Sequence, residues 1–277
     1  MLKNGLYIVT TPIGNLQDIS ARAVNTLKEA EIIACEDTRI SKKLFSLLGI
    51  SLAKKFITYE NYSEEKQAEH IIDIINEGQA VALISDAGSP LISDPGYKLV
   101  RKCREQGIYV TVIPGVSALI SALQISGLPT NRFMFAGFIP NKDKARIDLF
   151  TELKNIDTTL VFYETAPRLL KTLTVAAEVF SGREVSVARE LTKIHEECIC
   201  STFVEMINYF TANEPRGEFV LMVSPPVAKE FDKDDIKNIL LHRMTETSLK
   251  TAVKEVTAEF NLNKNDVYAL ALELKNE

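Results

Sequence analysis

Residues 63–96 read SEEKQAEHIIDIINEGQAVALISDAGSPLISDPG, and this stretch indicates how the first half of the chain folds. Between Ser63 and Glu77 the apolar residues recur at the spacing of one helix face, and Gly78 supplies the usual stop after a helix. That face carries Ile71, Ile72, Ile74 and Ile75. An apolar run then follows from Ala80 to Ser85, which is typical of a buried strand. Helix, glycine and strand in this order predict one unit of a parallel α/β sheet.

The same alternation extends outward on both sides of this stretch. Ser20 is placed to cap a helix that runs to Ala30, and Asp94-Pro95 has the pattern of an N-cap followed by proline at the first helical position. Gly107 is expected to end that later helix. Further strand-like runs lie at Leu6–Val9, Glu31–Cys35, Phe56–Tyr59 and Ile108–Ile113. Strands that alternate with helices predict a parallel, doubly wound sheet.

A second set of elements follows. Strand patterns lie at Phe133–Phe138, Thr159–Tyr163, Val185–Ala188, Glu197–Ser201 and Glu218–Val223, and helical patterns at Asp143–Lys154, Arg168–Phe180 and Phe203–Phe210. We place the hinge between Gly115 and Arg132, where Gly127-Leu128-Pro129 breaks the chain. Beyond Pro226, helical patterns occur at Ile236–Met244, Leu249–Phe260 and Asp266–Leu274. The sequence thus predicts two α/β domains, 1–115 and 116–226, and a helical tail, 227–277.

The composition fits a globular protein rather than a disordered chain. Of the 277 residues, 46% are hydrophobic and 25% are charged, and this length suggests about two domains of roughly 150 residues. The net charge of −5 argues against a nucleic-acid partner held by bulk charge alone. The charge is uneven, however. Thr38–Lys55 contains five basic residues and no acid, whereas Glu60–Glu77 contains six acids and one lysine.

The sequence argues against disulfide-rich, metal-binding, secreted and membrane-spanning proteins. The four cysteines include no C-x-x-C pair and the three histidines are scattered, so we expect reduced thiols and no metal site. Met1–Gly5 leads directly into a strand without the pattern of a signal peptide. The uncharged segment 108–131 is long enough to cross a membrane, but its proline, glycine and polar residues favour a strand, a tight loop and a buried helix. We expect a soluble, cytoplasmic protein with no membrane partner.

The loops that follow the strands carry the candidate chemistry, because ligands of open parallel sheets collect beyond the carboxyl ends of the strands. The loop Ser85–Gly96 is the richest of them. Asp86 can accept hydrogen bonds from a ribose or an amine, and Gly88 allows the backbone to approach a ligand. Pro90 and Pro95 stiffen this loop; the alternative is a simple turn into a helix. No dinucleotide-binding or P-loop glycine motif occurs, so any nucleoside-type ligand would bind without a phosphate cradle.

Charged residues also follow strands in both halves of the chain. Glu36-Asp37-Thr38-Arg39 comes after the second predicted strand, and Ala188-Arg189-Glu190-Leu191-Thr192-Lys193 after a strand of the second half. Arg216-Gly217-Glu218 precedes the last strand. A local cluster of ion pairs and helix caps would account for such residues equally well. Charged strand ends on both halves nevertheless favour a site in the cleft between them.

Taken together, these loops resemble the ribosomal RNA small subunit methyltransferase I family of the tetrapyrrole methylase superfamily. The motifs that carry the resemblance are Leu6–Ile19, Glu36–Arg39, Ser85–Pro90, Asp94–Tyr97, Pro114-Gly115, Gly137–Pro140, Phe162–Glu164 with Arg168, Ala188–Lys193 and Tyr268–Leu272. The resemblance covers essentially the whole chain. It implies two α/β domains of the tetrapyrrole methylase type, with S-adenosylmethionine in the cleft between them and a small C-terminal helical appendage. It also implies a homodimer that methylates the 2′-hydroxyl of a cytidine in 16S ribosomal RNA of the small subunit, near the decoding centre.

The resemblance also implies which residues form the site. The cofactor contacts of the superfamily fall on Pro12, Asp86, Ala87, Gly88, Ser117, Ala118, Phe162, Tyr163, Ala188 and Gly217. From position we expect Glu36 or Asp37 to accept the proton of the 2′-hydroxyl, and Arg39 and Lys193 to hold an RNA phosphate or the developing alkoxide. The basic clusters predict RNA contacts by Arg39, Lys42, Lys43, Lys142, Lys144 and Arg146.

Two other functions remain open from the sequence. The first is a methyltransferase of the same superfamily that acts on a corrin or porphyrin precursor. Against it stand the basic clusters and Thr11–Leu16, since the porphyrin-type members carry a glycine-rich loop after the first strand. The second is a non-catalytic ribosome-binding protein that retains a nucleoside pocket, an interpretation that the helical tail would fit.

Overall fold

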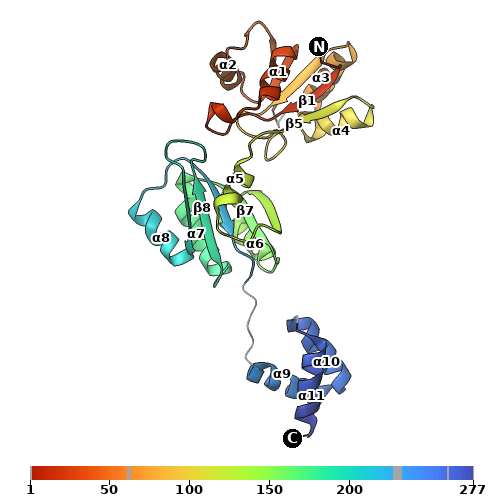
Figure 1. Cartoon of the computed structure of the whole chain (residues 1–277), viewed down its shortest axis with the longest axis vertical. Helices are drawn as coiled ribbons and strands as arrows, with labels where there is room; N and C mark the ends of the chain where they lie inside the picture. The colour runs from red at the N-terminus through yellow and green to blue at the C-terminus, as the bar shows by residue number, and fades with distance from the viewer. Residues whose placement is uncertain (1, 61–63, 227–232, 261, 277) are drawn as a thin grey trace. The chain divides into compact units, whose positions relative to one another are not determined.

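The computed structural model describes residues 2–60, 64–226, 233–260 and 262–276, whose helices and strands are drawn in Figure 1. They form two compact units, one within Met1–Pro226 and the other within Val227–Glu277. Among these residues every helix is too short or too polar to span a bilayer. The uncharged segment 108–131 instead contains a strand, Val110–Ile113, and a helix, Ala118–Ile125. The helix is not fully buried as predicted, since only one of its faces is buried and Ile120 and Ile125 are exposed.

The first sheet is parallel throughout. Its strands are β1 (Gly5–Val9), β2 (Ile32–Cys35), β3 (Lys55–Thr58), β4 (Ala80–Ile84) and β5 (Val110–Ile113), in the spatial order β3-β2-β4-β1-β5. In the central register Tyr7 of β1 lies between Ala82 and Thr111. Strands β2 and β4 are buried along their whole length. This burial on both faces explains why their sequences are continuous apolar runs rather than alternating ones.

Helices cover both faces of this sheet (Figure 1). Leu27 and Phe45 anchor two helices to one face, and Ile71 and Leu99 anchor two others to the opposite face. The helices are α1 (Ala21–Glu29), α2 (Thr38–Leu47), α3 (Glu64–Asn76) and α4 (Tyr97–Glu105), with a short 3₁₀ helix, η1 (Leu16–Asp18), before α1. The predicted doubly wound arrangement is therefore confirmed. Of the predicted helix at 63–77, residue 63 lies outside the described residues.

The start of α4 corrects one sequence prediction. Asp94-Pro95 predicts the N-cap and the first helical residue, but the helix begins at Tyr97 with Gly96 as its N-cap. Gly96 has no side chain to cap the helix and lies at φ 140°, where other residues are strained. The Oε1 atom of Glu64, on α3, accepts hydrogen bonds from the Gly96 N–H at 3.1 Å and from the Lys98 N–H at 3.2 Å. The cap thus comes from a residue 32 positions before Gly96, which no local pattern could reveal.

The second sheet is mixed. Its strands are β6 (Phe133–Phe138), β7 (Thr159–Thr165), β8 (Glu184–Arg189), β9 (Glu197–Thr202) and β10 (Glu218–Val223), in the order β6-β7-β10-β8-β9. Strand β6 pairs with β7 in parallel, and the remaining pairs are antiparallel. Its helices are α5 (Ala118–Ile125), α6 (Asp143–Leu153), α7 (Leu169–Val179) and α8 (Phe203–Ala212), and a 3₁₀ helix, η3 (Ala166–Arg168), leads into α7.

The two faces of the second sheet have separate cores. Helices α6, α7 and α8 pack on one face, in a core that includes Phe150, Leu173 and Met206. Helix α5 packs on the other face, where Leu119 and Leu123 meet residues of β7, β8 and β10. Helix α5 follows β5 of the first sheet directly in sequence yet contributes to the second. This arrangement suits a domain boundary at 115/116, which stays a prediction.

The described part of the tail is a bundle of α9 (Lys233–Glu246), α10 (Leu249–Phe260) and α11 (Lys264–Asn276). Its core consists of Ile236, Leu240, Ala252, Val253, Val256, Val267, Ala271 and Leu274. The Oγ atom of Ser248 accepts a hydrogen bond from the Thr251 N–H at 3.3 Å and so caps α10. The predicted helical appendage is confirmed, while its predicted start at residue 227 lies outside the described residues.

Candidate functional site

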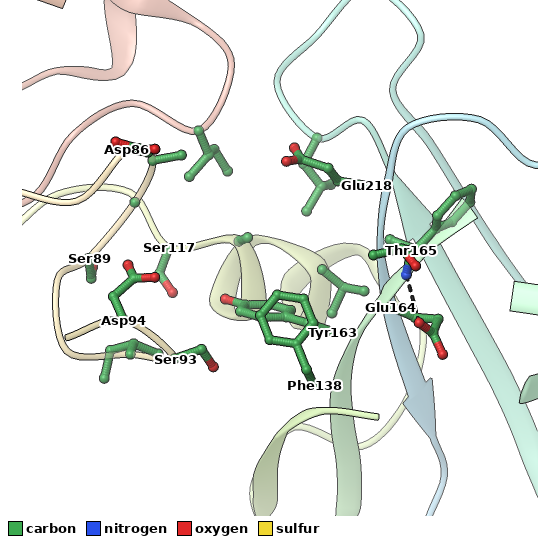
Figure 2. A pocket seen from close by; sticks show the side chains of 18 of the residues that line it. Asp86, Ser89, Ser93, Asp94, Ser117, Phe138, Tyr163, Glu164, Thr165 and Glu218 are labelled. Atoms are coloured by element: carbon green, nitrogen blue, oxygen red, sulfur yellow. Dashed lines mark hydrogen bonds between the residues drawn. The ribbon is translucent and has the colours of Figure 1, made fainter. Parts of the chain in front are cut away.

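Loops from both sheets surround one cavity of about 350 Å³, which we call the central cavity. Pockets for small molecules typically measure about 300–1,000 Å³. Figure 2 shows Asp86, Ser89 and Asp94 across the cavity from Tyr163, Thr165 and Glu218. The other lining residues are Ile13, Glu36, Ala87, Gly88, Ile92, Ser93, Ser117, Ala118, Phe138, Glu164, Glu190, Leu191, Lys193, Phe219 and Val220. The mixture of apolar walls with several carboxylates suits an organic ligand that carries positive charge.

Backbone hydrogen bonds join the loop after β1 to the loop after β4. The Thr11 N–H donates to the Gly88 carbonyl at 2.9 Å, and the Gly88 N–H donates to the Thr11 carbonyl at 3.1 Å. The Thr11 hydroxyl also donates to the Ser85 carbonyl at 3.2 Å. Gly88 lies at φ 78°, and a Cβ atom there would stand 3.3 Å from Cγ2 of Ile13. Glycine at position 88 thus lets the two loops form one continuous side of the cavity.

The loop Ser85–Gly96 is strained at two residues, of which Ser93 lines the cavity. Leu91 and Ser93 have φ angles of 73° and 69°, in the left-handed region that L-residues avoid. Such conformations cost about 1–3 kcal/mol each and persist only where the surroundings enforce them. Asp94 follows directly. Burial raises the pKa of its carboxyl, a hydrogen bond from Ser85 opposes the shift, and the charge of Asp86 adds to it.

Glu36 lies between the central cavity and a second, more open cavity. This edge cavity, of about 460 Å³, is lined by Glu36, Asp37, Thr38, Arg39, Thr58, Glu60 and Asp86. Burial raises the pKa of Glu36, and the charges of Asp94 and Asp86 raise it further. Burial also raises the pKa of Asp86, although the Asp37 N–H donates to its Oδ1 atom at 3.1 Å. Glu36 is therefore a carboxyl group that takes up protons more readily than an ordinary glutamate.

Asp37 differs sharply from its neighbour. Its side chain caps α2 by accepting the Arg39 N–H at 2.8 Å, and it holds the Arg39 guanidinium, with Nη2 2.6 Å from Oδ2. These bonds to Arg39 lower the pKa of Asp37 to about 2. A carboxylate with so low a pKa is a weak proton acceptor. The interpretation as a cap and ion pair therefore holds for Asp37, and Arg39 keeps an exposed side chain beside the edge cavity.

The wall formed by the second sheet combines aromatic rings with a buried ion pair. The rings of Phe138 and Tyr163 meet edge to face, 5.3 Å between centroids. The buried Glu164 carboxylate lies 2.6 Å from Nη2 of Arg168 and accepts the Thr172 hydroxyl at 2.6 Å. It also accepts the Thr165 N–H at 2.8 Å, drawn as the dashed line in Figure 2. These bonds fix the turn after β7 and with it the position of Thr165 at the cavity.

Lys193 is held between two carboxylates of the same wall. Its Nζ atom lies 2.9 Å from Oε1 of Glu190 and 2.9 Å from Oε2 of Glu218. Burial alone would lower the pKa of Lys193, but the hydrogen bonds to both glutamates raise it above its usual value. Its stem also packs against the loop after β1, because a Cβ atom on Gly14 would stand 2.6 Å from Cγ of Lys193. Lys193 thus links the loops of the two sheets, and its charge is compensated within the protein.

The structure brings most of the predicted cofactor residues together. Asp86, Ala87, Gly88, Ser117, Ala118 and Tyr163 line the central cavity. Pro12 and Gly217 do not line it, although their neighbours Ile13 and Glu218 do. The side chains of Phe162 and Ala188 are buried in the cores on the two faces of the second sheet. Phe162 points away from the cavity because successive residues of a strand face opposite sides, and Tyr163 takes the cavity side.

Sequence reasoning missed several lining residues. The local pattern marks Asp94 as a helix cap, and Ser93 carries no motif that would reveal its left-handed backbone. Phe138 and Glu190 stand in motifs that carry the family resemblance, yet the resemblance gives them no role. Strand alternation offered one usable signal, since it places Thr165 on the same side of β7 as Tyr163.

The predicted RNA-binding residues separate into exposed and buried ones. Arg39, Lys42 and Lys43 are exposed on α2, and Lys142 and Lys144 are exposed at the start of α6. Arg146 is the exception, with 1% of its side chain exposed. Its guanidinium donates to Asp143 and to the Asn141 carbonyl, so it stabilises the start of α6 and is withdrawn from any RNA surface.

Comparisons with known proteins agree with this architecture. Residues 5–206 match the family of Tetrapyrrole (Corrin/Porphyrin) Methylases, and residues 230–275 match the RsmI C-terminal HTH domain. Among solved structures, diphthine synthase superposes with a TM-score of 0.63 at 13% identity and covers 79% of this chain and 89% of its own. The methyltransferase CobJ gives a TM-score of 0.60 at 16% identity, over 83% of this chain and 97% of its own. At these identities the superpositions show the fold alone.

Sequence relatives are similar over nearly their whole length. The protein named ribosomal RNA small subunit methyltransferase I from Erythrobacter litoralis is 49% identical over 99% of this chain and 96% of the relative. The protein of the same name from Rickettsia prowazekii is 44% identical over 98% of this chain and 97% of the relative. With the fold, the cavity and both matched regions in agreement, the chain belongs to the ribosomal RNA small subunit methyltransferase I family of the tetrapyrrole methylases.

Proposed function

We propose that this protein uses S-adenosylmethionine to methylate the 2′-hydroxyl of a cytidine in 16S ribosomal RNA, near the decoding centre. The observation that carries the proposal is the family membership, because the similarity extends over both sheets and the tail of proteins named for methylating small-subunit ribosomal RNA. The central cavity supports it with a site of suitable size and chemistry. As an enzyme of ribosomal subunits, the protein would act in the cytoplasm.

The residues of the central cavity fit S-adenosylmethionine. Gly88 leaves space for the ligand to approach the backbone, and apolar side chains such as Ile92 and Phe138 offer contact surface for an adenosine. Asp86 and Asp94 supply negative charge for the sulfonium and the α-amino group. In the bound state the sulfonium supplies an electrophilic methyl group. We assign the contacts of this ligand to Asp86–Gly88, Ser117, Ala118 and Tyr163, with Asp94 added from the structure.

Glu36 is our choice for the acceptor of the 2′-hydroxyl proton. It borders both cavities, so a nucleotide in the edge cavity would meet it beside the methyl donor's site. Its raised pKa makes it a better base than Asp37, whose carboxylate is committed to Arg39. Between Asp37 and Glu36, the alternatives left open by the sequence, the geometry thus favours Glu36.

The two basic side chains proposed for RNA contact have different surroundings. Arg39 is exposed at the edge cavity and can contact a phosphate with the part of its guanidinium that Asp37 leaves free. Lys193 is held by Glu190 and Glu218, so we propose that it orients the wall of the central cavity. It could stabilise an alkoxide only if the alkoxide forms next to the position in which these glutamates hold its Nζ atom. Lys193 is a poor candidate for a phosphate clamp, because Glu190 and Glu218 already compensate its charge.

The exposed lysines of α2 lead to a prediction about RNA affinity. Replacing Lys42 and Lys43 together by glutamate should raise the KM for the ribosomal substrate and leave the Kd for S-adenosylmethionine unchanged. Each phosphate that the variant no longer neutralises should also lower the slope of log affinity against log salt by about 0.7–0.9. Salt titrations of binding to 30S subunits measure this slope. Lys28→Glu on α1 is the matched control, and an equal effect of that variant would contradict a specific role of α2.

We also propose a homodimer. Large apolar side chains are exposed on edge strands β5 and β6, just before β5 and on α5: Tyr109, Val112, Ile120, Ile125, Phe133 and Met134. Exposed apolar surface of this kind commonly marks an interface. Sedimentation equilibrium should therefore give twice the chain mass of 30.9 kDa. Phe133→Asp should shift the protein toward the monomer, and a monomeric mass of the unsubstituted protein at micromolar concentration would contradict the proposal.

Two experiments separate the proposal from its alternatives. Calorimetry first measures whether S-adenosylmethionine binds. Labelled methyl groups are then offered with 30S subunits, with free 16S RNA and with a porphyrin precursor as acceptors. Incorporation into the ribosomal substrate supports the proposal, and incorporation into the tetrapyrrole alone supports the small-molecule alternative. Cofactor binding without any incorporation would favour a non-catalytic ribosome-binding protein.

A further inference from the structure

Glu64 stands outside the central cavity, yet its carboxylate contacts the end of a loop that lines it. The residue lies on α3 and is 8% exposed. Its Oε1 atom accepts the N–H groups of Gly96 and Lys98, and the buried Tyr59 donates its hydroxyl to the same atom at 3.3 Å. Its Oε2 atom lies 3.9 Å from Nζ of Lys98. A buried carboxylate with this many donors fixes whatever backbone supplies them.

The backbone that it fixes is the end of the loop Ser85–Gly96. Leu91 folds back onto Gly96, so closely that a Cβ atom on Gly96 would stand 2.9 Å from Cδ1 of Leu91. Between these two residues lie Ile92, Ser93 and Asp94, all of which line the central cavity. The left-handed conformations of Leu91 and Ser93 are strained and need an anchor. Glu64 holds this segment at its C-terminal end, where the loop passes into α4.

We propose that Glu64 is a positioning residue, which holds the loop Ser85–Gly96 in the shape that binds the methyl donor. The proposal rests on the function proposed above, because it takes S-adenosylmethionine as the ligand of the central cavity. Without the carboxylate, the loop can relax from its strained conformations. The ligand then binds only to the smaller fraction of molecules whose loop keeps the competent shape. The apparent Kd equals the intrinsic Kd divided by that fraction, so it rises.

The decisive comparison is between Glu64→Ala and Glu205→Ala. Glu205 also caps a helix, since its carboxylate accepts the Thr202 N–H at 3.4 Å at the start of α8, but neither Thr202 nor its neighbours line the cavity. Both variants should lower the melting temperature. Only Glu64→Ala should raise the Kd for S-adenosylmethionine measured by calorimetry, by about tenfold if one molecule in ten keeps the competent loop.

Conservative variants distinguish positioning from general stability. Glu64→Gln keeps an oxygen that can accept both N–H groups and should restore a Kd close to that of the unsubstituted protein. The aspartate side chain of Glu64→Asp is too short to reach both N–H groups, so the Kd of this variant should stay well above that of the unsubstituted protein. Glu64→Asp therefore also serves as the test if the alanine variant does not fold. In steady-state kinetics the KM for S-adenosylmethionine should rise in Glu64→Asp, while the KM for 30S subunits stays the same.

The outcomes separate this inference from the proposed function. If the unsubstituted protein does not bind S-adenosylmethionine, the proposed function fails, and this inference fails with it. If the unsubstituted protein binds it and Glu64→Ala or Glu64→Asp binds equally well, the proposed function stands and the positioning role of Glu64 is overturned. A rise in Kd for Glu205→Ala as large as for Glu64→Ala would also overturn it.

Discussion

Glu36→Gln is expected to lower kcat for methyl transfer by about 10²–10⁴-fold, the usual contribution of a general base. The glutamine is nearly isosteric, so the shapes of the central and edge cavities should be retained. What is lost is the group that takes the proton of the 2′-hydroxyl as the oxygen attacks. Single-turnover kinetics with 30S subunits and saturating S-adenosylmethionine measures this step, and calorimetry on the same variant checks that the cofactor still binds.

The pH dependence of the same reaction provides a second test. Glu36 must be ionised to accept a proton, so activity should fall as the pH drops through its pKa. Burial and the charges of Asp94 and Asp86 raise that pKa. The acidic limb of the pH–activity profile should therefore lie above the ordinary glutamate pKa of about 4.3. Asp94→Asn removes one of these charges and should shift the limb toward lower pH. The limb should disappear in Glu36→Gln.

Asp37→Asn separates the two carboxylates that adjoin the edge cavity. Asparagine is an N-cap as good as aspartate, so α2 should keep its stability. If the large loss of kcat appeared in Asp37→Asn and not in Glu36→Gln, the assignment of the base would be wrong. Losses of equal size in both would indicate that the pair acts as one unit.

Gly88→Val should raise the Kd for S-adenosylmethionine by about 100-fold or more, which corresponds to roughly 2.8 kcal/mol and lies within the usual cost of over-packing. Gly88 lies at φ 78°, beside Ile13, on the side of the cavity that the loops after β1 and β4 share. A valine there is strained by the backbone, and its branched side chain occupies space next to the ligand. Calorimetry measures the loss directly.

Gly182→Val is the matched control for this substitution. Gly182 has almost the same backbone angle, φ 79°, but nothing lies within 4 Å of a Cβ atom built there, and it does not line the cavity. Both variants should lose stability to a similar degree, about 1–3 kcal/mol for the strained backbone. Only Gly88→Val should lose its affinity for S-adenosylmethionine. Normal binding by a folded Gly88→Val protein would exclude this cavity as the cofactor site.

Much of the fold follows from local patterns in the sequence. The apolar runs of β2 and β4 and the isoleucine face of α3 reveal a doubly wound sheet, because burial on two faces leaves no other arrangement of residues. The location of the site follows too, since the carboxyl ends of parallel strands meet at one edge. Asp86 and Gly88 can therefore be identified as candidate site residues from their positions in the sequence.

Long-range contacts set the limit of such reasoning. The cap of α4 comes from Glu64 on another helix, so the local Asp94-Pro95 pattern led to the wrong helix start. Arg146 differs, because the partners of its guanidinium, Asp143 and the Asn141 carbonyl, are close in sequence, and only the burial of its side chain could not be read from the local pattern. Glu36 and Asp37 differ because burial and the distant Asp94 and Asp86 raise the pKa of Glu36, whereas the neighbouring Arg39 lowers the pKa of Asp37.

Nucleoside analysis of methylated subunits identifies the atom that receives the methyl group. Unmethylated 30S subunits are incubated with the protein and with S-adenosylmethionine carrying a labelled methyl group, and the digested 16S RNA is separated into nucleosides for mass spectrometry. We expect the label in 2′-O-methylcytidine, with one labelled methyl group per 16S RNA, and none in the product of Glu36→Gln within the same time. Label on a base, or on the ribose of another nucleoside, would contradict it.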